Sequence, residues 1–332
     1  MKKNKVLSIS VIVVLLFAMV TGCSNTSKIK RCSLGSGSVG GTFYLMGGGI
    51  TTLINKYLPD NFMYSTETTG GSTANLGMLQ KGDVELGIAM TSSVLGGYQG
   101  SAAWTNGVAH DKVRGMIALY PSSMTIYALA DMDIETLKDL NGKTVGLGSK
   151  GAAMDTTLRI IFDEMGIKPS AIHNDGHSAT AKAVADGVID CAITFMNPPW
   201  PAIMEIEGTK DLKFIALTED EQNKIMDIFD FYSKSVIKKG AYKGVKEDTL
   251  SLNEWNFLCT SSDISVDEIY IITKTIYENQ ADLLAIHHAA SNIVPENNIY
   301  SPIPLHGGVV KYMEEVGIDV PSELIPDEYT KE

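Results

Sequence analysis

The chain has 332 residues, of which 44% are hydrophobic and 20% are charged, and its formal net charge is −12. This length predicts two domains with sizeable cores, and the composition excludes a disordered chain and a protein with several membrane spans. The acidic balance argues against a nucleic-acid partner, because phosphates require a basic surface.

The first 22 residues have the features of a lipoprotein signal peptide. Three lysines precede an apolar run at 6–20, which is shorter than the roughly 20 residues of a membrane span. The run ends in Val20-Thr21-Gly22-Cys23, which resembles the lipobox of bacterial lipoproteins, where the cysteine is lipidated. We expect residues 23–30 to be a tether that holds the protein outside the cytoplasm on the periplasmic face or outer cell surface. An ordinary secretory signal with an incidental Cys23 is the alternative.

Two similar series of elements follow in chain order. A glycine-rich loop, a helix, a second loop and a short helix ended by Gly82 lead into a strand that contains Glu85. Later a strand, a loop and helices lead through Gly187 into a strand that begins near Asp190, at the same offset of 105 residues. This repeat predicts two similar α/β lobes, and chance similarity of helix–glycine–strand junctions is the alternative. The chain becomes helical in character after residue 225.

Three loops of small residues each lead into a predicted helix: Ser38–Tyr44, Thr68–Ser72 and Gly148–Ala152. Such loops offer free backbone amides and the positive end of a helix dipole, which bind an anion without a basic side chain. If they converge, they form a cleft for a small carboxylate, with Lys150 as the only nearby fixed cation. Removing the three signal lysines lowers the net charge from −12 to −15, so the attraction has to be local.

The sequence gives little support for cofactor binding, metal binding or catalysis. Gly35–Gly40 matches G-x-G-x-x-G but lacks the acidic residue that a dinucleotide site requires, so we expect no cofactor; a flexible glycine loop is the alternative. The cysteines match no metal or redox spacing, and a turn separates His173 from His177, so no metal is expected. A disulfide between Cys32 and Cys259 stays open. Motifs of hydrolases are missing, so we expect no enzyme.

Six short segments carry a family resemblance through their order and spacing. They are Gly40–Tyr44, Thr69–Leu76, Asp139–Val145, Asp186–Asp190, Gly240–Gly244 and Pro304–Gly317. Together they resemble the TAXI family of solute-binding proteins, the receptors of one class of TRAP (tripartite ATP-independent periplasmic) transporters. Departures from the family pattern at Ser149–Ala152 and Asn197–Trp200 lie in expected cleft loops, so the ligand can differ from the family's common one.

The resemblance implies an α/β, two-lobed periplasmic-binding-protein fold of type II-like form, with crossing hinge segments. Lobe I would comprise 28–118 and 226–332, and lobe II would comprise 119–225. The implied function is capture of a small acid such as glutamate or 2-oxoglutarate by a monomer that delivers it to a TRAP membrane permease. The receptor of an ABC importer, or a ligand sensor partner, is the alternative. An extracytoplasmic enzyme is less favoured.

The predicted ligand site combines loop amides with hydroxyl, amide and aromatic side chains. Its members are Gly40, Gly41, Thr42, Tyr44, Thr69, Gly70, Gly71, Ser72, Asn75, Thr91, Ser149, Lys150, Gly151, Ala152, Phe195 and Asn197. Tyr120 and Trp200 are further candidates for stacking on the ligand, and we expect His306 to have a structural role.

Overall fold

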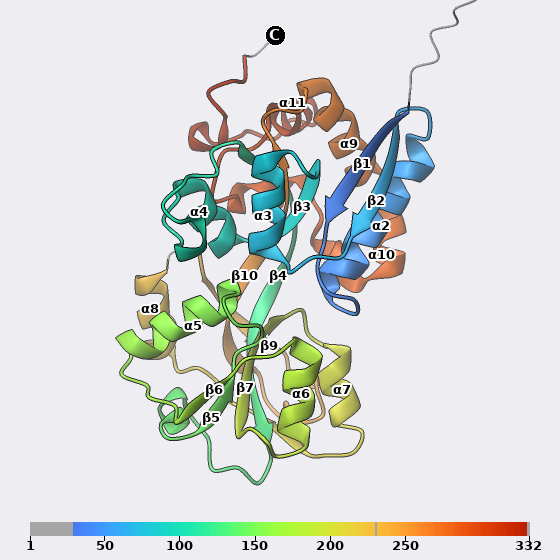
Figure 1. The fold of residues 1–332 in the computed structure, drawn as a ribbon. Helices are drawn as coiled ribbons and strands as arrows, with labels where there is room; N and C mark the ends of the chain where they lie inside the picture. Colours follow the sequence, from blue (N-terminus) through green and yellow to red (C-terminus); the bar gives the residue numbers. More distant parts are fainter. Residues whose placement is uncertain (1–28, 230, 331–332) are drawn as a thin grey trace, which may run out of the picture.

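The computed structural model describes residues 29–229 and 231–330, which form two α/β lobes stacked end to end (Figure 1). One curled sheet runs through both lobes with the strand order β2-β1-β3-β10-β4-β7-β5-β6, and β8 and β9 pair with β4 and β10. The two-lobed α/β architecture predicted from the sequence is confirmed. Within the described ranges, no helix is both long and apolar enough to cross a bilayer. The predicted signal peptide and Cys23 lie outside these ranges.

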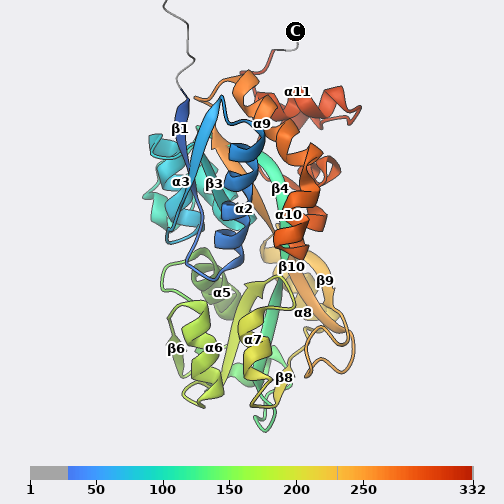
Figure 2. The same ribbon diagram turned by 90° about the vertical axis from the view of Figure 1, so that its right-hand side faces the viewer.

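The first lobe, at the top of Figure 1, packs helices on both faces of its part of the sheet. Helices α2, α9 and α10 cover one face, and α3 and α4 cover the other (Figure 2). Its elements are β1 (Lys30–Gly35), α2 (Thr42–Tyr57), β2 (Phe62–Glu67), α3 (Ser72–Lys81), β3 (Leu86–Met90), α4 (Thr91–Gln99), α9 (Val266–Glu278), α10 (Gln280–Ile286) and α11 (Gly307–Glu315).

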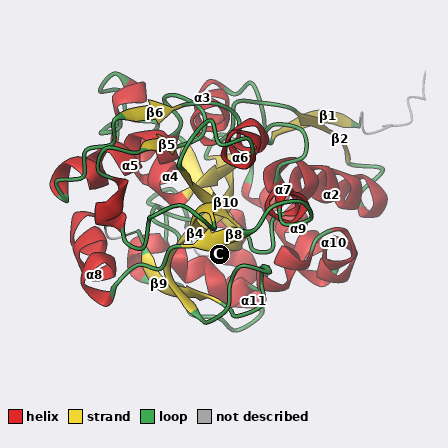
Figure 3. Ribbon diagram, turned by 90° about the horizontal axis from the view of Figure 1, so that it is seen from below, coloured by secondary structure: helices red, strands yellow, loops and turns green. Residues whose placement is uncertain are grey.

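The second lobe has the same plan, with α5 and α8 on one face of its strands and α6 and α7 on the other. Seen from below, the helices surround the central strands β4 and β10 (Figure 3). Its elements are β5 (Thr144–Gly146), α5 (Ala153–Glu164), β6 (Ala171–His173), α6 (His177–Ala185), β7 (Cys191–Met196), α7 (Pro201–Ile206), β8 (Leu212–Phe214), α8 (Glu219–Ile228) and β9 (Ser233–Ile237).

The lobes are joined by two long antiparallel strands, β4 (Val113–Leu129) and β10 (Thr249–Ser261), which pass through both of them. At the crossing, Tyr120 lies opposite Asn256, and the register of β10 shifts just after Asn256. The Ser123 hydroxyl donates to Asn253 Oδ1 at 2.7 Å and ties the two strands together. These two paired strands are the crossing segments expected from the sequence, and we refer to them as the hinge.

The internal repeat seen in the sequence has a structural basis. Gly82 is the C-cap residue of α3, and Gly187 comes directly after the C-cap residue of α6. Both have a positive φ (76° and 68°), a conformation that glycine adopts without strain. Three residues after each glycine, an acidic side chain accepts a hydrogen bond from one backbone amide, in β1 in the first lobe and in β5 in the second. Glu85 accepts from the Ser33 amide at 2.8 Å, and Asp190 accepts from the Thr144 amide at 2.7 Å. The same device therefore fixes the helix–strand junction in both lobes.

The segment after α8 packs in the second lobe. Tyr232 stacks on Phe195 with ring centroids 5.4 Å apart, and Tyr242 stacks on Phe214 at 4.8 Å. These rings belong to the hydrophobic clusters of the second lobe. We therefore propose that the chain returns to the first lobe within β10, which revises the boundary at residue 226 expected from the sequence.

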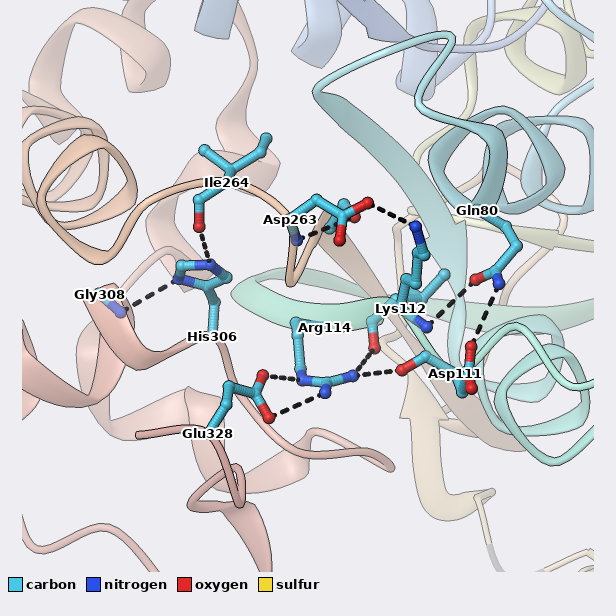
Figure 4. Close-up of polar contacts among 11 residues, drawn as sticks. Gln80, Asp111, Lys112, Arg114, Asp263, Ile264, His306, Gly308 and Glu328 are labelled. Atoms are coloured by element: carbon cyan, nitrogen blue, oxygen red, sulfur yellow. Dashed lines mark hydrogen bonds and ion pairs between the residues drawn. The ribbon is translucent and has the colours of Figure 1, made fainter. Parts of the chain in front are cut away.

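The C-terminal segment is held on the first lobe by polar contacts far from the crossing (Figure 4). Arg114 Nε and Nη2 donate to the two carboxylate oxygens of Glu328 at 2.7 and 3.0 Å. His306 Nδ1 accepts the Gly308 amide at 3.1 Å and caps α11, while Nε2 lies 3.0 Å from the Ile264 carbonyl. Because a carbonyl can only accept, the ring proton is on Nε2. His306 is thus part of the packing of the tail.

Candidate ligand-binding cleft

A cavity of about 210 Å³ lies between the lobes, next to the crossing strands. This is smaller than the roughly 300–1,000 Å³ of pockets for drug-sized ligands and suits a small metabolite. Residues of both lobes and of β4 and β10 line it: Gly37, Ser38, Gly41, Thr42, Phe43, Thr69, Gly70, Gly71, Ser72, Thr73, Met90, Tyr120, Ser122, Ser149, Ala152, Ala153, Met154, Gly176, His177, Phe195, Met196 and Asn256.

Five helices of the described chain begin at this cavity. The residues that precede their first turns line it: Gly41 (α2), Gly71 (α3), Met90 (α4), Ala152 (α5) and Gly176 (α6). None of the five has a side-chain cap. Of the five described helices that begin elsewhere, α8, α9 and α11 are capped by the side chains of Thr218, Ser265 and His306, and the short helices α7 and α10 have no side-chain cap. The uncapped amides at the cavity are therefore available to a ligand.

Acidic side chains already occupy three of these five helix starts. Glu254 accepts the Ser92 amide at 2.8 Å in the first turn of α4, and Asp155 accepts the Gly151 amide at 2.9 Å beside α5. At α6, Asp175 accepts the Gly176 amide at 2.7 Å. The starts of α2 and α3 have no acidic residue in their first turn. Two positive helix ends, both from the first lobe, therefore face the cavity.

A buried asparagine holds the glycine loops of the first lobe in place. Asn75 Nδ2 donates to the carbonyls of Ser36 and Ile88, both at 2.7 Å, and Oδ1 accepts the Thr69 hydroxyl at 2.6 Å. Thr69 Oγ1 in turn accepts the Gly71 amide at 3.1 Å. The φ of +91° at Gly71 favours glycine, because other residues are strained there. Asn75 thus positions the loop and does not line the cavity.

The walls of the cavity combine hydroxyl groups with apolar side chains. Hydroxyl groups come from Ser38, Thr42, Ser72, Ser122 and Ser149, and apolar surface comes from Phe43, Met90, Met154, Phe195 and Met196. No Lys, Arg, Asp or Glu is among the lining residues. The surface of the cavity therefore offers a ligand backbone dipoles and neutral polar groups, while the carboxylates at the starts of α4, α5 and α6 lie outside its lining.

Three polar atoms at the cavity are buried and have no hydrogen-bond partner within the described chain. They are the Tyr120 hydroxyl, His177 Nδ1 and Asn256 Oδ1. Burial lowers the pKa of His177 to about 4, so the ring is neutral near pH 7, and burial raises the pKa of Tyr120 well above its usual range. Such groups are costly to leave unpaired, which favours a ligand that supplies their partners.

The structure brings nine of the sixteen predicted site residues together at the cavity: Gly41, Thr42, Thr69, Gly70, Gly71, Ser72, Ser149, Ala152 and Phe195. The other seven do not line it. Gly40 and Tyr44 flank lining residues, Asn75 holds the loop, and Thr91 donates to the Trp255 carbonyl at 2.6 Å. Lys150 is exposed, the Gly151 amide binds Asp155, and Asn197 Nδ2 donates to the Pro121 carbonyl at 3.3 Å.

Sequence reasoning missed several lining residues. The turn at Asn174-Asp175-Gly176 before the helical pattern of α6 was a usable signal for His177. Ser122 and Asn256 carry no such signal, because they lie inside strands whose pairing joins segments over 130 residues apart.

Cys32, Cys191 and Cys259 are free and buried, so the open Cys32–Cys259 pairing is not formed. In the described ranges, no group of three or more His, Cys, Asp or Glu could hold a metal ion.

The NMT1-like family model matches residues 34–317. Among solved structures, one from the glutathione-import system of Streptococcus mutans (GshT and the cystine ABC importer TcyBC) has a TM-score of 0.51 and 13% identity, covering 81% of this chain and 99% of that one. A putative L-cystine ABC transporter from Listeria monocytogenes has a TM-score of 0.49, 15% identity and coverages of 80% and 99%. The alkanesulfonate-binding protein SsuA of Xanthomonas axonopodis pv. citri, bound to MOPS, has a TM-score of 0.47, 14% identity and coverages of 86% and 90%.

Proposed function

Because this chain belongs to the NMT1-like family, we propose that it is an extracytoplasmic solute-binding receptor that captures a small carboxylate between its lobes. One observation carries the proposal: the uncapped starts of α2 and α3 meet at a cavity whose lining residues include no charged side chain of either sign. Helix starts attract anions through their amides and dipoles, and the hydroxyl group of Ser149 lines the same cavity from the second lobe.

The magnitudes fit reversible capture. Each helix start contributes about 0.3–1 kcal/mol to binding a negative charge, and up to about 2 kcal/mol where water is partly excluded. The net charge of −15 expected for the mature chain opposes an approaching anion, but salt screens this repulsion beyond about 10 Å. Local amides therefore dominate once the ligand is in the cleft. Contacts from both lobes also favour a closed state only when the ligand is bound, as a transport receptor requires.

A second part of the proposal concerns the class of membrane transporter that receives the solute. The resemblance to TAXI proteins supports delivery to a TRAP membrane permease. The named systems of two structural neighbours are ABC importers, which keeps an ABC receptor as the second candidate, along with a ligand sensor partner. Genes beside this one that encode a large permease support TRAP, and an adjacent ATPase gene supports ABC. An extracytoplasmic enzyme is the least supported alternative, because the lining residues offer no carboxylate or thiol for catalysis.

A binding assay with a charge-matched pair of variants tests the carboxylate proposal. Isothermal titration of the purified mature chain would use dicarboxylates, 2-oxo acids and acidic amino acids, with neutral and cationic solutes for comparison. Ser149 lines the cavity, so Ser149→Asp places a negative charge there while Ser149→Asn keeps nearly the same shape. We expect Ser149→Asp to weaken binding of an acid at least tenfold and Ser149→Asn to have a much smaller effect. Binding of only neutral or cationic solutes would refute the proposal.

A further inference from the structure

Asn256 lines the cavity, and nothing in the described chain donates to its side-chain oxygen. The residue lies on β10 where the strands cross and is 1% exposed. Its Nδ2 donates to the Tyr120 carbonyl at 3.0 Å and to the Ser122 hydroxyl at 2.8 Å. Its Oδ1 is buried and lacks a partner, although the residue lines the cavity.

The orientation of this side-chain amide is fixed by its neighbours. A backbone carbonyl can only accept, so the atom facing the Tyr120 carbonyl has to be Nδ2. Turning the amide over would bring Oδ1 against that carbonyl and leave two acceptors facing each other. Both donors of Asn256 are also occupied by groups on β4. The acceptor therefore has a fixed orientation in a residue that lines the cavity.

A buried acceptor without a donor is costly, and a ligand that carries a donor removes the cost. The donor could be a hydroxyl or an ammonium group, since a 2-oxo group and a plain methylene carry none. An ammonium group would face the positive starts of α2 and α3, with no carboxylate among the lining residues to balance it. A hydroxyl group avoids this repulsion.

We propose that the ligand is a small hydroxycarboxylic acid, whose hydroxyl donates to Asn256 Oδ1 while its carboxylate groups bind the helix starts. This inference rests on the proposed function and names the ligand class of the same cavity. Asn256 is then a specificity-determining residue, because it separates acids that share a carbon skeleton but differ in one substituent. A site built to pair a ligand hydroxyl discriminates strongly against the analogue that lacks it.

The test is titration of the wild-type chain with two matched series. One is succinate, malate, oxaloacetate and aspartate, and the other is glutarate, 2-hydroxyglutarate, 2-oxoglutarate and glutamate, with both enantiomers of each chiral acid. In the series that fits the cavity, we expect the hydroxy acid to bind about 10- to 100-fold more tightly than the unsubstituted and oxo acids, and more tightly than the amino acid. Equal or tighter binding of the unsubstituted, oxo or amino member overturns the inference but leaves the carboxylate proposal intact. Failure of every member to bind refutes the carboxylate proposal itself.

A pair of variants assigns the preference to one atom. Asn256→Leu removes the acceptor at similar size, so the hydroxy acid should lose its advantage and bind within a few-fold of the unsubstituted acid. Asn197→Leu is the matched control, because Asn197 also has a buried, unpartnered Oδ1 but does not line the cavity. That control should keep the preference. Thermal unfolding without ligand shows whether both variants fold, and the wild-type series decides the question if one does not. A full preference in folded Asn256→Leu would contradict the role of Asn256.

Discussion

Glu254 is a buried carboxyl at the hinge, and its replacement by glutamine offers a test of the electrostatics of the crossing strands. It lies on β10 opposite Ser122, is 1% exposed and accepts the Ser92 amide at 2.8 Å. No basic side chain in the described ranges forms an ion pair with it. Burial raises the pKa of Glu254 from 4.5 to about 7, and the hydrogen bond from the Ser92 amide lowers it only in part.

The sign of the effect follows from linkage. Because the folded-state pKa is raised, the folded chain holds a proton that the unfolded chain has released between pH 4.5 and about 7. Stability therefore falls as pH rises through this window, and the loss is complete above about pH 7. A pKa change from 4.5 to about 7 corresponds to about 3 kcal/mol, since one pKa unit is worth about 1.4 kcal/mol.

Glu254→Gln keeps an acceptor for the Ser92 amide and removes the charge. We expect the variant to gain stability over the wild type progressively from pH 5 to pH 8, by about 3 kcal/mol across the range. Urea unfolding at each pH measures the difference, and Glu164→Gln, an exposed change of the same kind on α5, is the control. A difference between Glu254→Gln and wild type that does not change with pH would refute this reasoning.

Three further predictions concern other parts of the chain. Burial lowers the pKa of His306 from 6.5 to about 4, so its contribution to stability is complete above pH 6.5 and is lost as pH falls toward 4. His306→Asn should therefore reduce the loss of unfolding free energy between pH 6.5 and pH 4 by up to about 3 kcal/mol, as measured by urea unfolding. Arg114→Met should release the C-terminal segment to limited proteolysis at a cost of about 1 kcal/mol, because its partner Glu328 is partly exposed, and resistance equal to wild type would contradict the anchoring role. Cys23→Ala should move the protein from the membrane fraction to the soluble fraction, and unchanged fractionation would exclude the lipid anchor.

The sequence was informative wherever local composition determines local structure. Small residues before an apolar helical pattern predict an uncapped helix start, and the loops at Thr68–Ser72 and Gly148–Ala152 both reach the cavity. The prediction was less exact for side-chain direction. Phe43 lines the cavity and its neighbour Tyr44 does not, because successive residues on a helix point about 100° apart and the start of α2 has to be known to choose between them.

The residues that set specificity were beyond the reach of local patterns, for a physical reason. Asn256 faces the cavity only because β10 pairs with β4 in one register, and a shift by one residue would turn its side chain to the opposite face of the sheet. That register depends on contacts between segments more than 130 residues apart, which a motif cannot encode. The loops, in contrast, are proposed to bind through backbone amides, so almost any small residue can serve there. The proposed affinity for an anion can therefore be predicted from the sequence, while the proposed choice among anions depends on the crossing strands and has to be tested at Asn256.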